Sequence, residues 1–285
     1  MVHLCQTLEV SRSSFYAWQE GKTYVLKAEK ARIRNEVKTV FYEHKRRYGS
    51  RRIEAELKGS GIPVGRYQVR HSMEEQGLKA IQPKSFVPKT TQTNPNLKRS
   101  PNLLLEMDRI NQINTVWVGD ITYLAMADGS WSYLATWMDL CSRMIVGWKV
   151  GKSLDASLVI RSFEKALIRR QPIQGLIVHS DGGGQYMDLE FRKIIREKNF
   201  CQSMTRVDNH YDNAFAESLF SRFKAELMCN QAFNSFQEAQ SKIFEYIEAY
   251  YNRKRRHSSL NYKSPENFEN NRKTNPQSTN EYSLI

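Results

Sequence analysis

Three acidic residues in this chain have neighbours that suit a metal-binding site. Asp120 lies in the segment WVGDITY, Asp181 in HSDGGGQY and Glu217 in DNAFAES. Carboxylate oxygens are the ligands that hard divalent cations such as Mg²⁺ prefer. Two such ions held about 3.5 to 4 Å apart can activate a water or a hydroxyl and stabilise the leaving oxygen of an in-line displacement at phosphorus. If folding brings the three residues together, they predict nuclease or strand-transfer chemistry.

The surroundings of the two aspartates predict β-strands. Asp120 lies in an apolar run, residues 116–126, whose alternate side chains would face opposite sides of a sheet. Both sets are largely apolar, so we expect this strand to be buried on both faces. Asp181 comes just after the apolar residues 176–178 and is followed by three glycines, which predict a loop that a ligand can approach closely. Ligands of open α/β sheets bind at such carboxyl ends of strands.

Glu217 is predicted to lie on an amphipathic helix that begins near residue 212. Apolar residues recur through 214–227 at helical spacing and would form one face. Asn213, Ser221 and Lys224 lie four or seven residues from Glu217 and would share its side of the helix. That side is polar, and Asn213 and Lys224 are candidate contacts to a DNA backbone or ordinary exposed helix residues.

Other residues near these motifs have simpler explanations. Asp128 belongs to an Asp-Gly turn, and Asp139 precedes a turn that it can cap, so both are left out of the metal site. His179 is expected to be a packed or hydrogen-bonded neighbour, because Mg²⁺ prefers oxygen ligands.

Composition restricts the class of protein. The chain has 285 residues, of which 40% are hydrophobic, which is enough for two or more domains and one sizeable core. No stretch reaches the roughly 18 uninterrupted apolar residues of a membrane helix, and the first residues lack a signal-peptide pattern. A cytoplasmic location without membrane contact is therefore expected. The four cysteines are far apart, which predicts neither disulfides nor a zinc site.

Positive charge is concentrated in the first part of the chain. Lys and Arg exceed Asp and Glu by 11 in residues 1–100 and by 2 in residues 101–285, which accounts for the net charge of +13. A basic region of this size is typical of a nucleic-acid-binding protein, because Lys and Arg release counterions from phosphates. The alternative is a basic surface that only maintains solubility.

Helical patterns dominate residues 1–81. Residues 1–46 are predicted to form an N-terminal helical region with one long helix at about 27–44, and residues 47–81 a helix-turn-helix unit. In that unit the helices 50–57 and 66–76 are joined by a Gly-Pro turn, and the second helix would present arginines to a DNA groove. A plain helical hairpin with solvated arginines is the alternative. Residues 82–102 are rich in proline and basic, and are predicted to be an extended linker.

Residues 103–269 are predicted to form the catalytic core, with a polar tail at 270–285. An Asp-Gly turn between apolar runs predicts a hairpin, and further strands and helices alternate after it. The expected strands are 116–126, 131–138, 144–150, 176–181 and 200–204, and the expected helices are 155–170, 188–198, the Glu217 helix and 236–251. The predicted order is βββαβαβα, which is an α/β arrangement.

The three acidic motifs, in this order and with thirty-five residues between Asp181 and Glu217, resemble those of DDE transposases of the insertion sequence three family. The resemblance extends upstream to YGSRRI at 48–53 and EQGL at 75–78, and downstream to YN at 251–252, RHSSLNY at 256–262 and SP at 264–265. It therefore covers nearly the whole chain. Several separate motifs in the right order are more specific than any one of them.

This resemblance implies an RNase H-like, integrase-type core preceded by an all-α helix-turn-helix region. It implies that Asp120, Asp181 and Glu217 hold two Mg²⁺ ions, with Mn²⁺ as a substitute, and catalyse cleavage and strand transfer of insertion-element DNA. The implied partners are the double-stranded element ends and target DNA, further copies of the chain assembled on DNA, and an upstream reading-frame product, fused or separate. A nucleoid-associated location follows.

Basic residues in the motifs and helices are the candidate DNA contacts. The set comprises Arg51, Arg52, Arg66, Arg70, Asn213, Lys224, Arg255 and Arg256. Two other functions remain open at this stage. A DNA-binding regulator with an inactive core would bind DNA without metal-dependent cleavage, and a host-adapted nuclease of the same fold would cut DNA without joining it.

Overall fold

The computed structural model describes residues 5, 7, 9–21, 28–83, 99–107, 110–206, 214–228 and 232–274, with the backbone alone at 214–217. The chain divides into two compact units, Met1–Ile81 and Gln82–Ile285. This division coincides with the predicted start of the linker at residue 82. Each unit is described by itself below.

The first unit contains helices that share one small core. Besides α2 (Arg12–Gln19), its helices are α3 (Ala28–Glu43), α4 (Ser50–Gly59) and α5 (Arg66–Glu75). Val37 and Phe41 of α3 pack with Ile53 of α4 and Val69 of α5, and all four are buried. Because α3 completes the core of the helix pair, the predicted boundary between residues 46 and 47 does not separate two domains. The predicted pair of helices joined by a short turn is confirmed.

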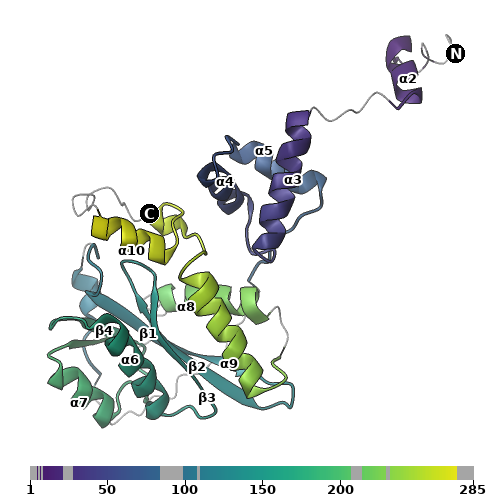
Figure 1. Ribbon diagram of the computed structural model, residues 1–285. Helices are drawn as coiled ribbons and strands as arrows, with labels where there is room; N and C mark the ends of the chain where they lie inside the picture. Colours follow the sequence, from purple (N-terminus) through teal and green to yellow (C-terminus); the bar gives the residue numbers. More distant parts are fainter. Residues whose placement is uncertain are drawn as a thin grey trace. The chain divides into compact units, whose positions relative to one another are not determined.

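The second unit is built on a five-stranded mixed sheet (Figure 1). Its strands are β1 (Val116–Ala125), β2 (Trp131–Asp139), β3 (Ile145–Gly151), β4 (Ile177–Ser180) and β5 (Cys201–Met204), in the spatial order β3-β2-β1-β4-β5. The β1–β2 and β2–β3 pairs are antiparallel, whereas β1–β4 and β4–β5 are parallel. With α6 (Ala156–Arg170), α7 (Leu189–Glu197) and α8 (Ala214–Phe223), the chain order is the predicted βββαβαβα.

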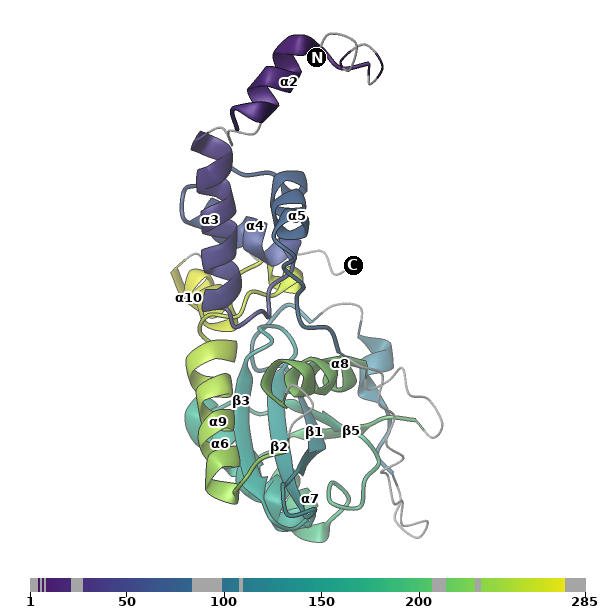
Figure 2. The ribbon, with the colours of Figure 1, turned by 90° about the vertical axis from the view of Figure 1, so that its right-hand side faces the viewer.

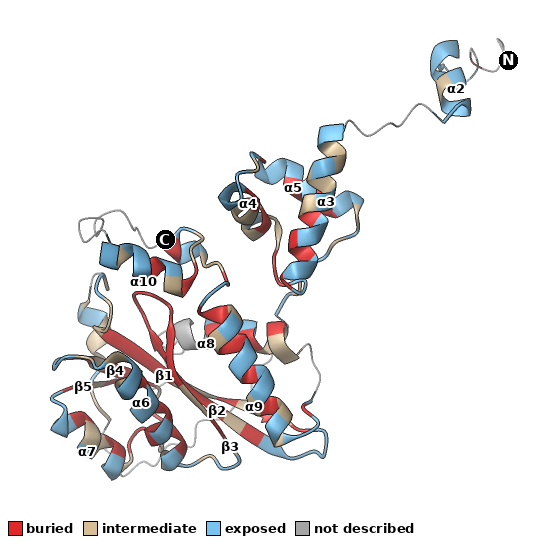
Figure 3. Cartoon of the chain, in the orientation of Figure 1, coloured by how far each residue is buried: buried red, intermediate tan, exposed pale blue. Residues whose placement is uncertain are grey.

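Helices cover both faces of this sheet, as the burial of β1 on both sides requires (Figures 2 and 3). Val118 of β1 packs with Phe220 of α8 and with α9 (Phe236–Phe244) on one face. Trp117 packs with Phe163 of α6 and with α7 on the other. The alternation predicted for this strand is confirmed. After α8 and α9 the chain continues as the π-helical segments η3 (Lys224–Met228) and η4 (Glu245–Tyr251).

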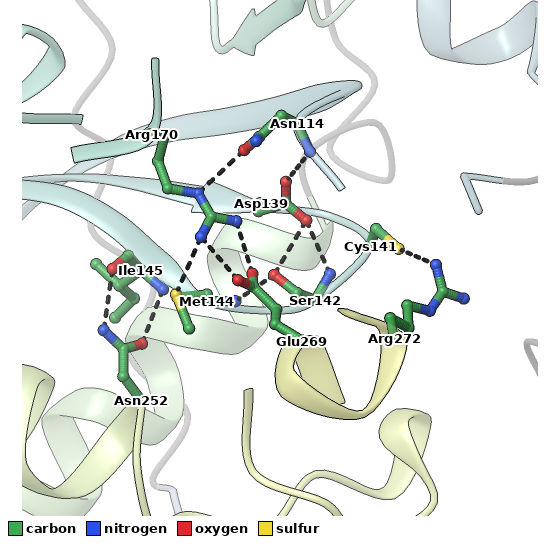
Figure 4. A network of polar contacts seen from close by, with 10 residues as sticks. All are labelled: Asn114, Asp139, Cys141, Ser142, Met144, Ile145, Arg170, Asn252, Glu269 and Arg272. Carbon is green, nitrogen blue, oxygen red and sulfur yellow. Dashed lines mark hydrogen bonds and ion pairs between the residues drawn. The ribbon is translucent and has the colours of Figure 1, made fainter. Parts of the chain in front are cut away.

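The C-terminal part of the core differs from the prediction. Residues Pro265–Thr274 form the helix α10, so regular structure extends past residue 269, where the polar tail was expected to begin. Glu269 is buried and accepts two hydrogen bonds from Arg170 of α6, at 2.6 and 2.7 Å (Figure 4). Arg170 also donates to Asn114 at 3.0 Å. The helix forms because one buried ion pair and the side chain of Phe268 attach it to the core.

The helices of the described ranges were compared with the length and hydropathy that a membrane-spanning helix needs. No helix there is both long enough and apolar enough to cross a membrane.

Candidate active site

The two candidate aspartates belong to two adjacent parallel strands and the residue that follows one of them: Asp120 lies within β1, and Asp181 comes directly after the end of β4. Val118 of β1 is in register with His179 of β4. Asp120 and Asp181 each follow two residues later, Asp120 still within its strand and Asp181 at the start of the glycine loop. Neighbouring strands are about 4.8 Å apart. The pairing of β1 with β4 therefore places Asp120 and Asp181, two half-buried residues that are 61 positions apart in sequence, on neighbouring segments of the chain.

Backbone amides orient both carboxylates. The Ile121 amide donates to Asp120 Oδ1 at 2.8 Å, and the Gly183 amide donates to Asp181 Oδ1 at 3.0 Å. The second bond folds the glycine loop back onto the carboxylate that precedes it. Each aspartate thus has one oxygen in a fixed position relative to the sheet.

The buried Tyr186 interacts electrostatically with both aspartates. Tyr186 is 2% exposed, and burial raises the pKa of its hydroxyl well above the usual value. The charges of Asp120 and Asp181 raise this pKa further, because a second negative charge nearby is unfavourable. The two carboxylates and this hydroxyl therefore belong to one electrostatic environment.

Helix α8 packs over the face of the sheet that carries Asp120. Phe220 and Phe223 are buried against the Val118 side of β1. Lys224, directly after α8, is half-buried, which lowers the pKa of its amine, while the charge of Asp120 raises it. The Lys224 amine and the Asp120 carboxylate therefore attract each other electrostatically.

The third acidic residue is described only in part. The backbone of Glu217 lies in α8, seven residues before Lys224 and so on the same side of the helix. Its side chain, and the whole of Asn213, lie outside the described residues. Among the side chains that are described, no three of the types His, Cys, Asp and Glu form a group that could hold a metal ion. Participation of Glu217 therefore stays a prediction.

Known protein families match both units of the chain. Residues 28–86 match an HTH-like domain, and residues 111–210 and 199–265 match two models of an integrase core domain. The transposase InsF of insertion sequence IS3A from Escherichia coli (strain K12) is 36% identical over 269 residues, which are 94% of this chain and 93% of that protein. The chain belongs to this family of insertion-sequence transposases.

Two more relatives and two solved structures resemble the transposase. The transposase of IS904 from Lactococcus lactis is 39% identical over 83% of this chain and 93% of its own length, and a 31 kDa protein of IS600 from Shigella sonnei is 38% identical over 93% and 97%. A simian T-cell lymphotropic virus intasome in complex with a PP2A regulatory subunit matches with a TM-score of 0.47 and 14% identity, over 82% of this chain and 73% of that one. An HTLV-2 integrase catalytic core in complex with magnesium gives 0.41 and 14%, over 54% and 95%.

Three residues that were left out of the predicted metal site have the structural roles that were predicted for them. Asp139 is fully buried and accepts from the Ser142 amide at 2.8 Å and the Asn114 amide at 2.6 Å. Asp128 accepts from the Ser130 amide at 2.9 Å within its turn. His179 is buried, and its Nδ1 is hydrogen-bonded to Ser203 at 2.9 Å. All three predictions are confirmed.

The prediction for Arg255 is wrong. This residue was predicted to contact DNA as part of a basic run, but its side chain is 2% exposed and forms an ion pair with the buried Glu226 of η3. Tyr246 of η4 donates to the same carboxylate at 2.8 Å. The group joins η3, directly after the Glu217 helix, to the segments that follow α9. Arg255 therefore stabilises the transposase and has no surface to offer to a phosphate.

The other basic candidates fall into two groups. In the first unit, Arg51, Arg66 and Arg70 are exposed, and Arg70 forms an ion pair with Glu74 at 2.8 Å. Arg52 is half-buried over the ring of Tyr48, 5.7 Å from its centroid. In the second unit, the half-buried Arg256 donates to the Tyr262 carbonyl at 2.9 Å.

Sequence reasoning missed two residues close to the acidic pair. Tyr186 is the second residue after the three glycines, so its place in the HSDGGGQY motif was a usable signal. Arg99 lies against Gly182, the residue after Asp181. Its position in a basic, proline-rich stretch gave no signal, because every lysine and arginine there looked alike.

Proposed function

We propose that Asp120, Asp181 and Glu217 form the metal-binding catalytic site of this transposase and hold two Mg²⁺ ions, for which Mn²⁺ can substitute. The observation that supports the proposal is the parallel pairing of β1 with β4, in which Asp120 and Asp181 each come two residues after the paired residues Val118 and His179. The position of α8 supports the third ligand, because Lys224 on the same side of that helix interacts with Asp120.

The residues at this position fit the proposed ions. The donors are carboxylate oxygens, which suit Mg²⁺ better than nitrogen or sulfur ligands do. Asp120 and Asp181 are half-buried, so they are held by the fold and remain accessible from one side. When bound, the ions would lower the pKa of a water and stabilise charge on the oxygens around the reacting phosphorus.

The proposed reaction has two displacements at phosphorus. In the first, a water oxygen forms a bond to phosphorus at the element end, its proton leaves, and the P–O3′ bond breaks to give a free 3′-hydroxyl and a 5′-phosphate. In the second, that 3′-hydroxyl attacks a phosphodiester of target DNA and releases a target 3′-hydroxyl. Neither displacement forms a covalent bond between protein and DNA.

Other residues would bind the DNA. We propose that Lys224 and Asn213 contact the strand near the scissile phosphate, and that Arg256 contacts the backbone beside the core. Arg51, Arg52, Arg66 and Arg70 of the HTH-like unit would bind the element ends. Several copies of the chain would assemble on DNA in the nucleoid, with the upstream reading-frame product fused or separate.

A cleavage and joining assay tests the proposal. Labelled element-end DNA is incubated with Mg²⁺ and the wild type or the variants D120N, D181N and E217Q, and we expect each substitution to reduce cleavage by about 100-fold or more. D128N, which removes an exposed turn carboxylate, is the matched control and should cleave normally. Undiminished cleavage by E217Q would eliminate the assignment, and cleavage without joined products would indicate a nuclease.

A further inference from the structure

The space beside Gly182 is filled by an arginine. A Cβ atom at Gly182 would lie 2.5 Å from Nη2 and 2.6 Å from Nε of Arg99. The guanidinium therefore occupies the position that any larger residue at 182 would need for its own side chain. Gly182 directly follows Asp181 in the chain, so a permanently charged group contacts the loop that begins with this aspartate.

The position of Arg99 is set by its neighbours in the chain. Residues 100–103 are hydrogen-bonded to the edge strand β5 at three points. These are Ser100 Oγ to Gln202 Oε1 at 2.9 Å, the Met204 amide to the Pro101 carbonyl at 3.2 Å, and the Leu103 amide to Ser203 Oγ at 3.0 Å. Ser203 is in turn hydrogen-bonded to the buried His179 of β4. The segment is thereby fixed to the sheet that carries Asp181.

We propose that Arg99 is a phosphate-binding residue of the active site, which holds the reacting DNA strand beside Asp181. The inference rests on the proposed function. A cluster of carboxylates repels a phosphodiester, and an adjacent guanidinium reduces this repulsion and offers several N–H donors in one plane. One side of the guanidinium is against Gly182, where no side chain intervenes, so the group lies close to the backbone of the catalytic loop.

The three consecutive glycines allow the contact between Arg99 and Gly182 to be tested separately from other changes in the loop. None of Gly182, Gly183 and Gly184 has a positive φ, so alanine introduces no backbone strain at these positions. At Gly184 a Cβ would have no neighbour within 4 Å, whereas at Gly183 it would lie 2.9 Å from Asp181 Oδ1. At Gly182 the neighbour is the end of a flexible side chain, which can move away. G182A should therefore fold normally and displace the guanidinium.

The experiment compares R99A, R99K, G182A, G184A and the double variant R99A/G182A in the full chain, with labelled element-end DNA and Mg²⁺. We expect R99A and G182A each to lower kcat/KM by about 10- to 100-fold, mainly through KM, and R99K to retain part of the activity. The double variant should be no worse than R99A, because both changes remove the same contact. G184A, which adds a methyl group to the same loop away from Arg99, should lower kcat/KM less than G182A does, and thermal unfolding should show all five variants folded.

DNA affinity measured against salt concentration on the E217Q background separates this proposal from the function it rests on. Loss of one phosphate contact should reduce the slope of log K against log salt by about one. An unchanged slope of log K against log salt in R99A would overturn the role of Arg99, whether or not the wild type cleaves DNA. The same conclusion would follow if the double variant lost DNA affinity by the product of the two single losses. Normal activity in E217Q would instead remove the proposed catalytic site.

Discussion

Arg255 and Glu226 form a buried ion pair in which Nη2 lies 2.6 Å from Oε1 and Nε lies 2.9 Å from Oε2. Burial opposes the charge on Arg255, but the carboxylate and its hydrogen bonds outweigh this effect and raise the pKa of the guanidinium above its ordinary value. The pair connects the π-helical segment after α8 with the chain beyond η4, although the two residues are 29 positions apart.

Removal of Arg255 should destabilise the core strongly. In R255A the carboxylate of Glu226 stays buried without its partner, so we expect the free energy of unfolding to fall by about 3 to 5 kcal/mol. Urea denaturation measures this loss. R169A is the matched control, because Arg169 pairs with Glu248 at 2.9 Å but is 39% exposed, and it should cost about 1 kcal/mol or less. Equal losses in both variants would contradict a special role for the buried pair.

Helix α10 should be essential to the stability of the core. E269A leaves Arg170 without the carboxylate that accepts two of its hydrogen bonds, and we expect a loss of about 2 to 4 kcal/mol in the free energy of unfolding. E266A, whose carboxylate is 43% exposed and 3.8 Å from Arg253, should change it by less than about 0.5 kcal/mol. Thermal denaturation of both variants distinguishes a stabilising helix from a dispensable tail.

Gly119 should be required for packing next to the first aspartate. A Cβ there would lie 2.6 Å from Cη2 and 2.8 Å from Cε3 of Trp137, which is 1% exposed in the core and cannot easily move. We expect G119A to lose about 1 to 3 kcal/mol of stability through overpacking. Chemical denaturation of G119A and G184A provides the comparison, and indistinguishable midpoints would show that the ring adjusts without cost.

The buried thiol of Cys141 should be protected and should affect stability only at alkaline pH. Burial raises its pKa from 9.0 to about 11. At pH 8, an alkylating reagent should modify the exposed Cys201 and leave Cys141 unmodified in the folded protein, whereas both cysteines should react in urea. Mass analysis of the peptides measures which cysteines have reacted. Rapid modification of Cys141 in the folded chain would show that its environment is open.

The raised pKa of Cys141 predicts the direction in which the free energy of unfolding changes with pH. Above pH 9 the unfolded thiol loses its proton while the folded one keeps it, so the folded state binds more protons and stability falls as pH rises towards about 11. Unfolding free energies of the wild type and C141A, measured from pH 8 to 11, should diverge in this direction. Parallel curves would contradict the shift.

Most of the sheet could be predicted from sequence because its signals are local. Alternation in β1 and the Asp-Gly turn after it indicated the hairpin, and the structure places the strands β1 and β2 within one residue of the predicted ends. The motifs around Asp120 and Asp181 indicated one shared site, but they could not predict that β1 pairs with β4, because the pairing and register of strands depend on distant segments.

The errors arose where distant residues determine the outcome. Arg255 looked like its exposed neighbours Arg253 and Lys254, and only the position of Glu226 in space distinguishes it. The sequence of α10, PENFENNRKT, is polar, and its attachment depends on Arg170 from a helix 99 residues earlier. Local patterns contain no information on such partners.

The parallel register of β1 and β4 also has a consequence during synthesis on the ribosome. β1 emerges early, but its carboxylate has no counterpart until the crossover through α6 is complete and β4 can insert beside it. A nascent chain that stops before residue 181 lacks one member of the pair altogether. The site proposed for Asp120 and Asp181 can therefore form only after β4 and residue 181 have left the ribosome.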